Sequence, residues 1–124
     1  MLKFLKILFV GLLISNISYA QISTKEVKEL LDKHFVEHKD VILRIAILET
    51  GYFKSNKAVN HKNLFGFETG KKHFSTYEES VLAFKTRVYS RLKKGENFYT
   101  FLKRIGYAAD KNYIYKLKKI KTWV

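Results

Sequence analysis

The sequence predicts one mainly α domain: about five helices, one of them buried at the centre, and a short β-hairpin lobe. Four segments carry apolar residues at helical spacing, and a fifth segment, residues 41–48, is apolar on almost every side. A helix that is apolar all round is a buried one. A short apolar stretch broken by turn residues, at positions 64–74, provides the lobe.

The first twenty residues are predicted to be a secretory signal peptide. Lys3 and Lys6 precede an apolar run at positions 7–14, and Ser18-Tyr19-Ala20 is a small-x-small cleavage pattern. The alternative is a membrane anchor, but a span needs about 20 apolar residues and this run is shorter. Cleavage after Ala20 would release residues 21–124, with no integral membrane segment, to the periplasm or the medium. Those 104 residues suffice for one domain with one core.

Composition narrows the function classes further. The chain has no cysteine, which excludes disulfides, thiolate metal sites and a lipidated cysteine at the cleavage site. The net charge is +13, or +11 without the two leader lysines, and favours polyanions: nucleic acid, anionic membranes or acidic cell-wall polymers. Export makes nucleic acid the least expected partner.

The first mature helix is predicted to begin at Ser23, which has the capping-box spacing to Glu26. Its inward face carries Val27, Leu30, Leu31, His34 and Phe35. Asp40 is the predicted N-cap of the buried helix that follows.

The buried helix ends in a carboxylate, Glu49, followed by Thr50 and by Gly51, a residue that commonly stops helices. Burial and the negative end of the helix dipole would both raise the pKa of Glu49. A carboxylic acid that stays protonated near neutral pH is what a glycosidase uses to protonate a leaving oxygen. The alternative is an ordinary helix-end residue facing water.

Residues 52–63 are predicted to form a loop because polar residues interrupt the pattern. His61 and His73 have no third ligand at metal-like spacing, so no metal site and no cofactor are predicted. Residues 64–74 are the predicted hairpin, in which Gly66 would allow another group to approach the backbone closely.

Three further helices are predicted. Ser75 with Glu78 and Thr76 with Glu79 give two overlapping capping-box spacings before a helix that stops near Gly95. Asn97 and Asp110 are the predicted caps of the last two helices. Their inward residues are Phe98, Phe101, Leu102 and Ile105 in the first, and Tyr113, Ile114, Leu117 and Ile120 in the second.

Four motifs occur in a fixed order along the chain: Leu48-Glu49-Thr50-Gly51, Lys62-Asn63-Leu64-Phe65-Gly66, Thr76-Tyr77-Glu78-Glu79-Ser80, and Gly106-Tyr107-Ala108-Ala109-Asp110-Lys111-Asn112-Tyr113. Together they resemble the bacterial glucosaminidase family, glycoside hydrolase family 73, a branch of the lysozyme superfamily. The resemblance covers roughly residues 29–120. Each motif alone has a structural explanation, whereas four in order are much more specific.

The resemblance implies an α+β, lysozyme-like fold with a groove between the helical body and the lobe. The substrate would be the glycan strands of peptidoglycan, cut at a β-1,4 bond between amino sugars. Glu49 matches the catalytic acid of the family and Tyr107 its active-site tyrosine. Asn63 and Phe65 match the turn that lines the groove. We add three candidate substrate contacts, Glu68, Asp110 and Tyr113, and expect a monomer.

Two departures from the family pattern leave the mechanism open. Lys62 replaces the first Asn of the turn motif, and Glu68 is the sole acid between Gly66 and the next helix. With one clear acid, the acetamido group of the substrate could assist, or a sugar hydroxyl could attack internally, as in a lytic transglycosylase. A non-catalytic glycan-binding module and a cationic membrane-active protein, suggested by the basic residues 116–121, remain alternatives.

Overall fold

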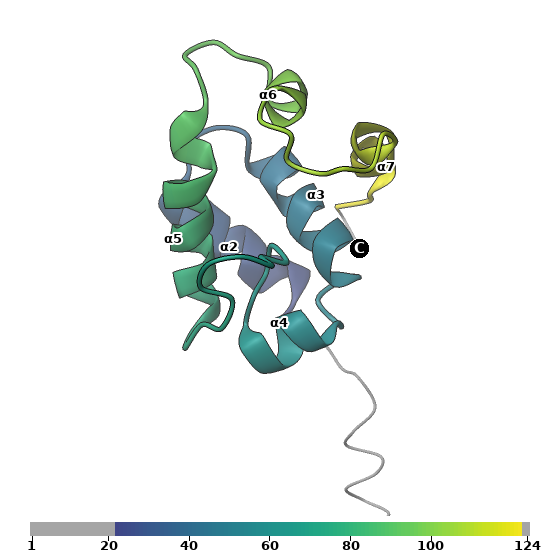
Figure 1. Cartoon of the computed structure of the whole chain (residues 1–124). Coiled ribbons are helices and arrows are strands. Elements are labelled where there is room, and N and C mark those ends of the chain that lie inside the picture. The colour runs from purple at the N-terminus through teal and green to yellow at the C-terminus, as the bar shows by residue number, and fades with distance from the viewer. Residues whose placement is uncertain (1–21, 123–124) are drawn as a thin grey trace, which may run out of the picture.

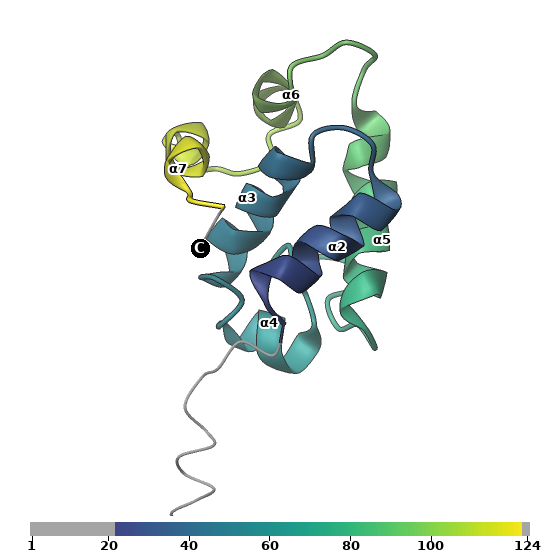
Figure 2. The ribbon, with the colours of Figure 1, turned by 180° about the vertical axis from the view of Figure 1, so that it is seen from behind.

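The computed structural model describes residues 22–122, and in that range the chain is helical with irregular connections. The predicted signal peptide lies outside the described residues. The elements are α2 (Thr24–His34), α3 (Lys39–Thr50), α4 (Asn56–His61), α5 (Tyr77–Arg87), the 3-10 helix η1 (Tyr89–Arg91), α6 (Phe98–Arg104) and α7 (Tyr113–Lys119). Helix α3 runs between α2 and α5 on one side and α6 and α7 on the other, with α4 at its C-terminal end (Figures 1 and 2). None of the helices within residues 22–122 combines the length and apolar character that a membrane crossing requires.

The predicted central helix is confirmed as α3. Half of its residues are buried: Ile42, Leu43, Ile45, Ala46, Ile47 and Thr50. Each fully buried large aliphatic side chain contributes about 1.5–3 kcal/mol, so α3 is a major source of the stability of this cysteine-free domain. Its start differs from the prediction. The N-cap is His38, in the left-handed region, while Asp40 lies within the first turn and pairs with Arg44 at 3.1 Å.

The helix caps of α2, α5 and α6 follow the sequence closely. Ser23 and Glu26 form both hydrogen bonds of a capping box. Thr76 Oγ1 accepts from the Glu79 N–H, and Asn97 Oδ1 accepts from the Thr100 N–H. The predicted capping box of Ser75 and Glu78 is wrong, because the N-cap of α5 is Thr76, one residue later than that spacing requires.

Glu78 instead joins α5 to α2. One of its carboxylate oxygens lies 2.8 Å from Lys33 Nζ and 2.7 Å from His34 Nε2. These contacts hold the pKa of the Glu78 carboxyl below its usual value. Helix α5 ends at Arg87 and is followed by η1, so it does not continue to Gly95 as predicted.

The prediction of a loop over residues 52–63 is wrong in its second half, which forms α4. Ser55 caps this six-residue helix by accepting from the Ala58 N–H at 3.3 Å. Ala58 is the one residue of α4 that is buried, so the segment shows almost no apolar periodicity. The helix depends on its cap and on its place against the domain, which a hydrophobic pattern does not reveal.

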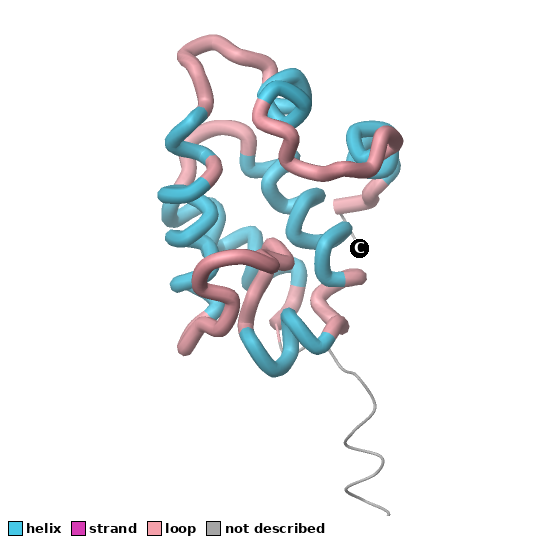
Figure 3. The backbone as a smooth tube through the Cα atoms, viewed as in Figure 1, coloured by secondary structure: helices cyan, strands magenta, loops and turns pink. Residues whose placement is uncertain are grey.

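The predicted β-hairpin over residues 64–74 is also wrong. No strand occurs within residues 22–122, and this segment is irregular (Figure 3). The two halves of the predicted hairpin are too short to pair stably. Side chains, in place of a partner strand, make hydrogen bonds to the main chain of this segment. The Asn63 side chain donates to the Phe67 carbonyl at 2.9 Å and accepts from the Phe67 N–H at 3.0 Å. The fold is therefore mainly α, without the predicted β component.

The last helix begins later than its predicted cap. Helix α7 starts at Tyr113, after an N-cap, Asn112, that makes no side-chain capping bond. Asp110 closes the turn before it: Oδ1 accepts from the Asn112 N–H at 2.8 Å, and Oδ2 pairs with Lys116. Asp110 therefore organises the approach to α7 without being its N-cap.

Candidate active site

Glu49 lies in the last turn of α3, partly buried, with a defined neighbour for each carboxylate oxygen. Tyr113 on α7 donates its hydroxyl proton to Oε2 at 2.8 Å. The backbone of Gly66 lies against the other side: a Cβ placed on Gly66 would be 3.2 Å from both Cβ and Oε1 of Glu49. Three segments distant in sequence thus meet at one carboxyl group. The prediction that Gly66 permits a close approach is confirmed.

The exit of α3 fixes the position of Glu49. Thr50, fully buried, donates its hydroxyl to the Ala46 carbonyl at 2.6 Å and accepts from the Phe53 N–H at 2.9 Å. Gly51, Tyr52 and Phe53 all have positive φ, a costly conformation for the two aromatic residues. The chain therefore turns sharply after the carboxylate and leads directly into α4.

Burial raises the pKa of Glu49 above its ordinary value, as the sequence predicted. The hydrogen bond from Tyr113 and the charge of Lys57 act in the opposite direction, and the charge of Glu68 adds to the rise. Lys57 on α4 and Glu68 form an ion pair at 3.0 Å. This pair therefore contributes two opposing fields at Glu49, and burial determines the net direction.

Two tyrosines stand beside the carboxyl group. The ring of Tyr107 is 5.9 Å from that of Tyr113 and meets Phe84 edge-on at 6.2 Å. Burial raises the pKa of both hydroxyls, and the negative charge of Glu49 raises them further. Both tyrosines therefore remain neutral hydrogen-bond donors at any pH at which the domain would work.

Asn63 and Phe65, which the resemblance places on the groove wall, are both buried. The ring of Phe65 stacks on Phe84 at 4.3 Å, and the Asn63 side chain closes the turn to Phe67. These side chains support the turn from inside the domain. What the turn presents to Glu49 is the backbone of Gly66.

The two remaining acidic candidates differ in their relation to Glu49. Glu68 is exposed, and its charge acts on Glu49. Asp110 lies at a hollow of about 240 Å³ that Tyr113 also lines. Its contacts to Lys116 and to the Asn112 N–H hold the pKa of Asp110 below its usual value, so it is a charged group at neutral pH.

The ring centres of His61 and His73 are 3.9 Å apart. Within residues 22–122, no group of three or more histidine, cysteine or acidic side chains is arranged to hold a metal ion. The raised pKa of Glu49 and the two neutral phenols beside it suit proton transfer from a carboxylic acid.

Comparison with known proteins identifies the family. The family model for the glucosaminidase domain, described as mannosyl-glycoprotein endo-β-N-acetylglucosaminidase, matches residues 24–122. No curated protein matches the chain, and no solved structure does. The family match spans nearly all the described residues, including every group that surrounds Glu49. The chain belongs to the glucosaminidase family and is a glycosidase of the type that acts on peptidoglycan.

Proposed function

We propose that the protein is an exported peptidoglycan hydrolase that cleaves β-1,4 bonds between GlcNAc and MurNAc, with Glu49 as the general acid. The observation that carries the proposal is the environment of Glu49, a carboxyl group with a raised pKa between the Tyr113 hydroxyl and the Gly66 backbone. A titratable group whose pKa is shifted by burial, within the residues that match a glycosidase family, is a strong candidate for the acid.

The first step would be proton donation from Glu49 to the oxygen of the leaving sugar. A raised pKa keeps a larger fraction of the carboxyl group protonated near neutral pH, which is the state a general acid requires. After transfer, the Tyr113 hydroxyl at 2.8 Å would stabilise the carboxylate that forms. Tyr107, against the ring of Tyr113, would orient the sugar or a water molecule.

The group that would act together with Glu49 on the glycosidic bond has more than one candidate. A glycosidase that uses two carboxylates places them about 5 Å apart for retention or about 6.5–9.5 Å apart for inversion. Glu68 is the carboxylate whose charge acts on Glu49, but it is exposed and paired with Lys57. Assistance by the acetamido group of the substrate would need no second carboxylate. A second candidate is a lytic transglycosylase, in which a sugar hydroxyl attacks internally and Glu49 is the one acid required.

The site of action would be the cell wall, outside the cytoplasm. The substrate class of the family lies there, and the predicted leader would deliver the chain to the periplasm or the medium. The strong positive charge of the sequence would keep the protein on an anionic wall. We propose that it acts as a monomer, without a cofactor.

The test is the release of soluble fragments from purified peptidoglycan by residues 21–124 and by two variants. Glu49→Gln should lose nearly all activity and keep its fold. Glu29→Gln is the matched control, because it makes the same change at an exposed carboxylate on α2, outside the candidate site. Full activity of Glu49→Gln would reject Glu49 as the acid. Retention of the wild-type protein in the wall pellet without any release would favour the binding module. Leakage from anionic vesicles without wall lysis would favour the membrane-active alternative.

A further inference from the structure

The lobe segment, residues 67–74, keeps its position with almost no hydrogen bonding of its own main chain. Asn63 holds its first residue, Phe67, and the N–H of its last residue, Phe74, donates to the His61 carbonyl at 2.9 Å. Within the described range, the main chain of residues 68–73 makes one hydrogen bond, from Arg87 Nη1 to the Lys71 carbonyl at 2.9 Å. Arg87 therefore supplies the one hydrogen bond to the main chain in the middle of the segment.

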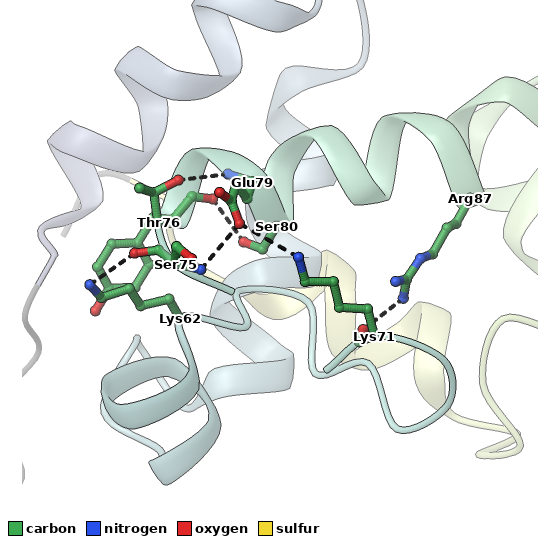
Figure 4. A network of polar contacts seen from close by, with 8 residues as sticks. Lys62, Lys71, Ser75, Thr76, Glu79, Ser80 and Arg87 are labelled. Carbon is green, nitrogen blue, oxygen red and sulfur yellow. Dashed lines mark hydrogen bonds and ion pairs between the residues drawn. The ribbon is translucent and has the colours of Figure 1, made fainter. Parts of the chain in front are cut away.

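Arg87 makes several contacts to this segment from the last turn of α5. Its guanidinium lies 4.6 Å from the ring centre of Phe67 and 6.0 Å from that of Phe74. A Cβ on Gly70 would lie 3.7–3.8 Å from the guanidinium atoms, so the chain runs directly over the group. Figure 4 shows Arg87 reaching from α5 to the Lys71 carbonyl at the turn of the lobe.

The chemistry of these contacts requires arginine. A planar guanidinium stacks on aromatic rings and donates in its own plane at the same time, whereas a lysine ammonium does not. Within the described residues, Arg87 has no carboxylate partner, so its contacts are to this segment. The ion pair of Lys71 with Glu79 on α5 is long, 3.8 Å, and adds little.

The lobe segment is continuous with the wall of the candidate site. Gly66 immediately precedes it and packs against Glu49. The Asn63 side chain closes the turn that contains Gly66 by bonding both main-chain groups of Phe67. A displacement of the segment would pull on that turn and expose the carboxyl group of Glu49 to water.

We propose that Arg87 is a positioning residue, which fastens the lobe segment to α5 and so holds Gly66 over Glu49. It replaces with one side chain the strand pairing that a β-hairpin would supply. The effect on catalysis rests on the proposed function, whereas the fastening itself does not.

The fastening is tested without any enzyme assay, by limited trypsin digestion of the folded protein. Lys71 and Lys72 are exposed within the segment and are natural cleavage sites. In Arg87→Met, cleavage after these lysines should be about tenfold faster than in the wild type, since a charged hydrogen bond and a ring contact are lost. Lys85→Met is the matched control, because it removes a positive charge from the same helix but lies over Phe35, away from the lobe.

Arg87→Lys keeps the charge without the planar group, so it should resemble Arg87→Met in this assay. Unchanged cleavage after Lys71 and Lys72 in Arg87→Met would overturn the proposal. So would an equal increase at every cleavage site, including the Lys93 and Lys94 loop, because that result would indicate general loosening of the fold.

The catalytic consequence has its own readout, the pH dependence of glycan cleavage. If the segment moves, water reaches Glu49 and its pKa falls towards the ordinary value. The alkaline limb of the activity profile of Arg87→Met should then shift to lower pH, while that of Lys85→Met stays in place. An unshifted profile alongside faster trypsin cleavage would overturn the link to Glu49. Absence of activity in every form, including the wild type, would reject the proposed function and leave the trypsin result to decide the fastening.

Discussion

Replacement of Gly66 by alanine tests whether the lobe turn and Glu49 are in the contact described above. Gly66 has φ +65°, and the new methyl group would lie 3.2 Å from both Cβ and Oε1 of Glu49. The carboxylate oxygen can rotate away, but the Cβ of Glu49 moves only with α3, which is buried. The turn and the carboxyl group must therefore separate by a few tenths of an ångström.

The chain contains a matched control for this change in Gly95. Gly95 has φ +76°, and a Cβ there would meet nothing within 4 Å. Alanine at either position carries the cost of a left-handed conformation, about 1–2 kcal/mol. Only alanine at position 66 adds the contact with Glu49. The difference between the two variants therefore isolates that contact from backbone strain.

The assay combines thermal unfolding with the rate of fragment release from purified peptidoglycan. Gly95→Ala should lower Tm by about 4–8 °C per kcal/mol of destabilisation and leave kcat unchanged. Gly66→Ala should lower Tm further and reduce kcat about tenfold or more, since small misplacements of a catalytic group are costly. Equal kcat in the two variants, with both proteins folded, would refute the contact between this turn and the reacting carboxyl group.

Two further predictions concern Glu49 and its hydrogen bond. The hydrogen bond from Tyr113 to Oε2 lowers the pKa of Glu49, so Tyr113→Phe should raise that pKa and move the alkaline limb of the activity profile to higher pH. The same change should lower kcat about tenfold. An alkaline limb that stays in place would contradict the role of this bond. Glu49→Gln should raise Tm at neutral pH, because burial raises the pKa of Glu49, which means that the folded state disfavours the charged carboxylate relative to the unfolded chain. The destabilisation of the wild type by the charged Glu49 grows as the pH rises from the ordinary pKa, about 4.3, through the raised pKa, and it is absent below the ordinary pKa. The higher Tm of Glu49→Gln should therefore disappear in acid. An advantage independent of pH would show that ionisation is not its cause.

Local features of the fold could be predicted from the sequence because their causes are local. The apolar run of α3 requires burial on every side, and Ser23, Thr76 and Asn97 cap their helices with bonds to residues three positions away. Helix α4 escaped prediction because it buries one residue and depends on the Ser55 cap. The pattern of apolar residues does not predict such a helix.

The hairpin failed because strand pairing depends on contacts that the segment itself does not encode. Residues 64–74 contain aromatic residues and a turn, but their main chain is held by Asn63 and Arg87. Arg87 was missed since a basic residue in the last turn of a helix has an ordinary explanation in the helix dipole. Only the structure brings its guanidinium to the Lys71 carbonyl.

The candidate site was predictable in kind but not in geometry. The motif order made Glu49 and Tyr107 candidates, Tyr113 was a candidate substrate contact, and the glycine between two phenylalanines indicated a close approach at Gly66. The hydrogen bond from Tyr113 to Glu49 joins residues 64 positions apart, which no local pattern specifies. For the same reason, the burial of Asn63 and Phe65 became evident only in the structure.

The measurement that tests the central claim most directly is digestion of purified peptidoglycan by residues 21–124, with mass spectrometry of the soluble products. The wild type should release muropeptides with a new sugar end, and Glu49→Gln should release almost none. A reducing GlcNAc end would identify a glucosaminidase, a reducing MurNAc end a muramidase, and an anhydro-MurNAc end a transglycosylase. Equal release by the wild type and Glu49→Gln, or no release by the folded wild type, would contradict Glu49 as the acid of a wall-cleaving enzyme.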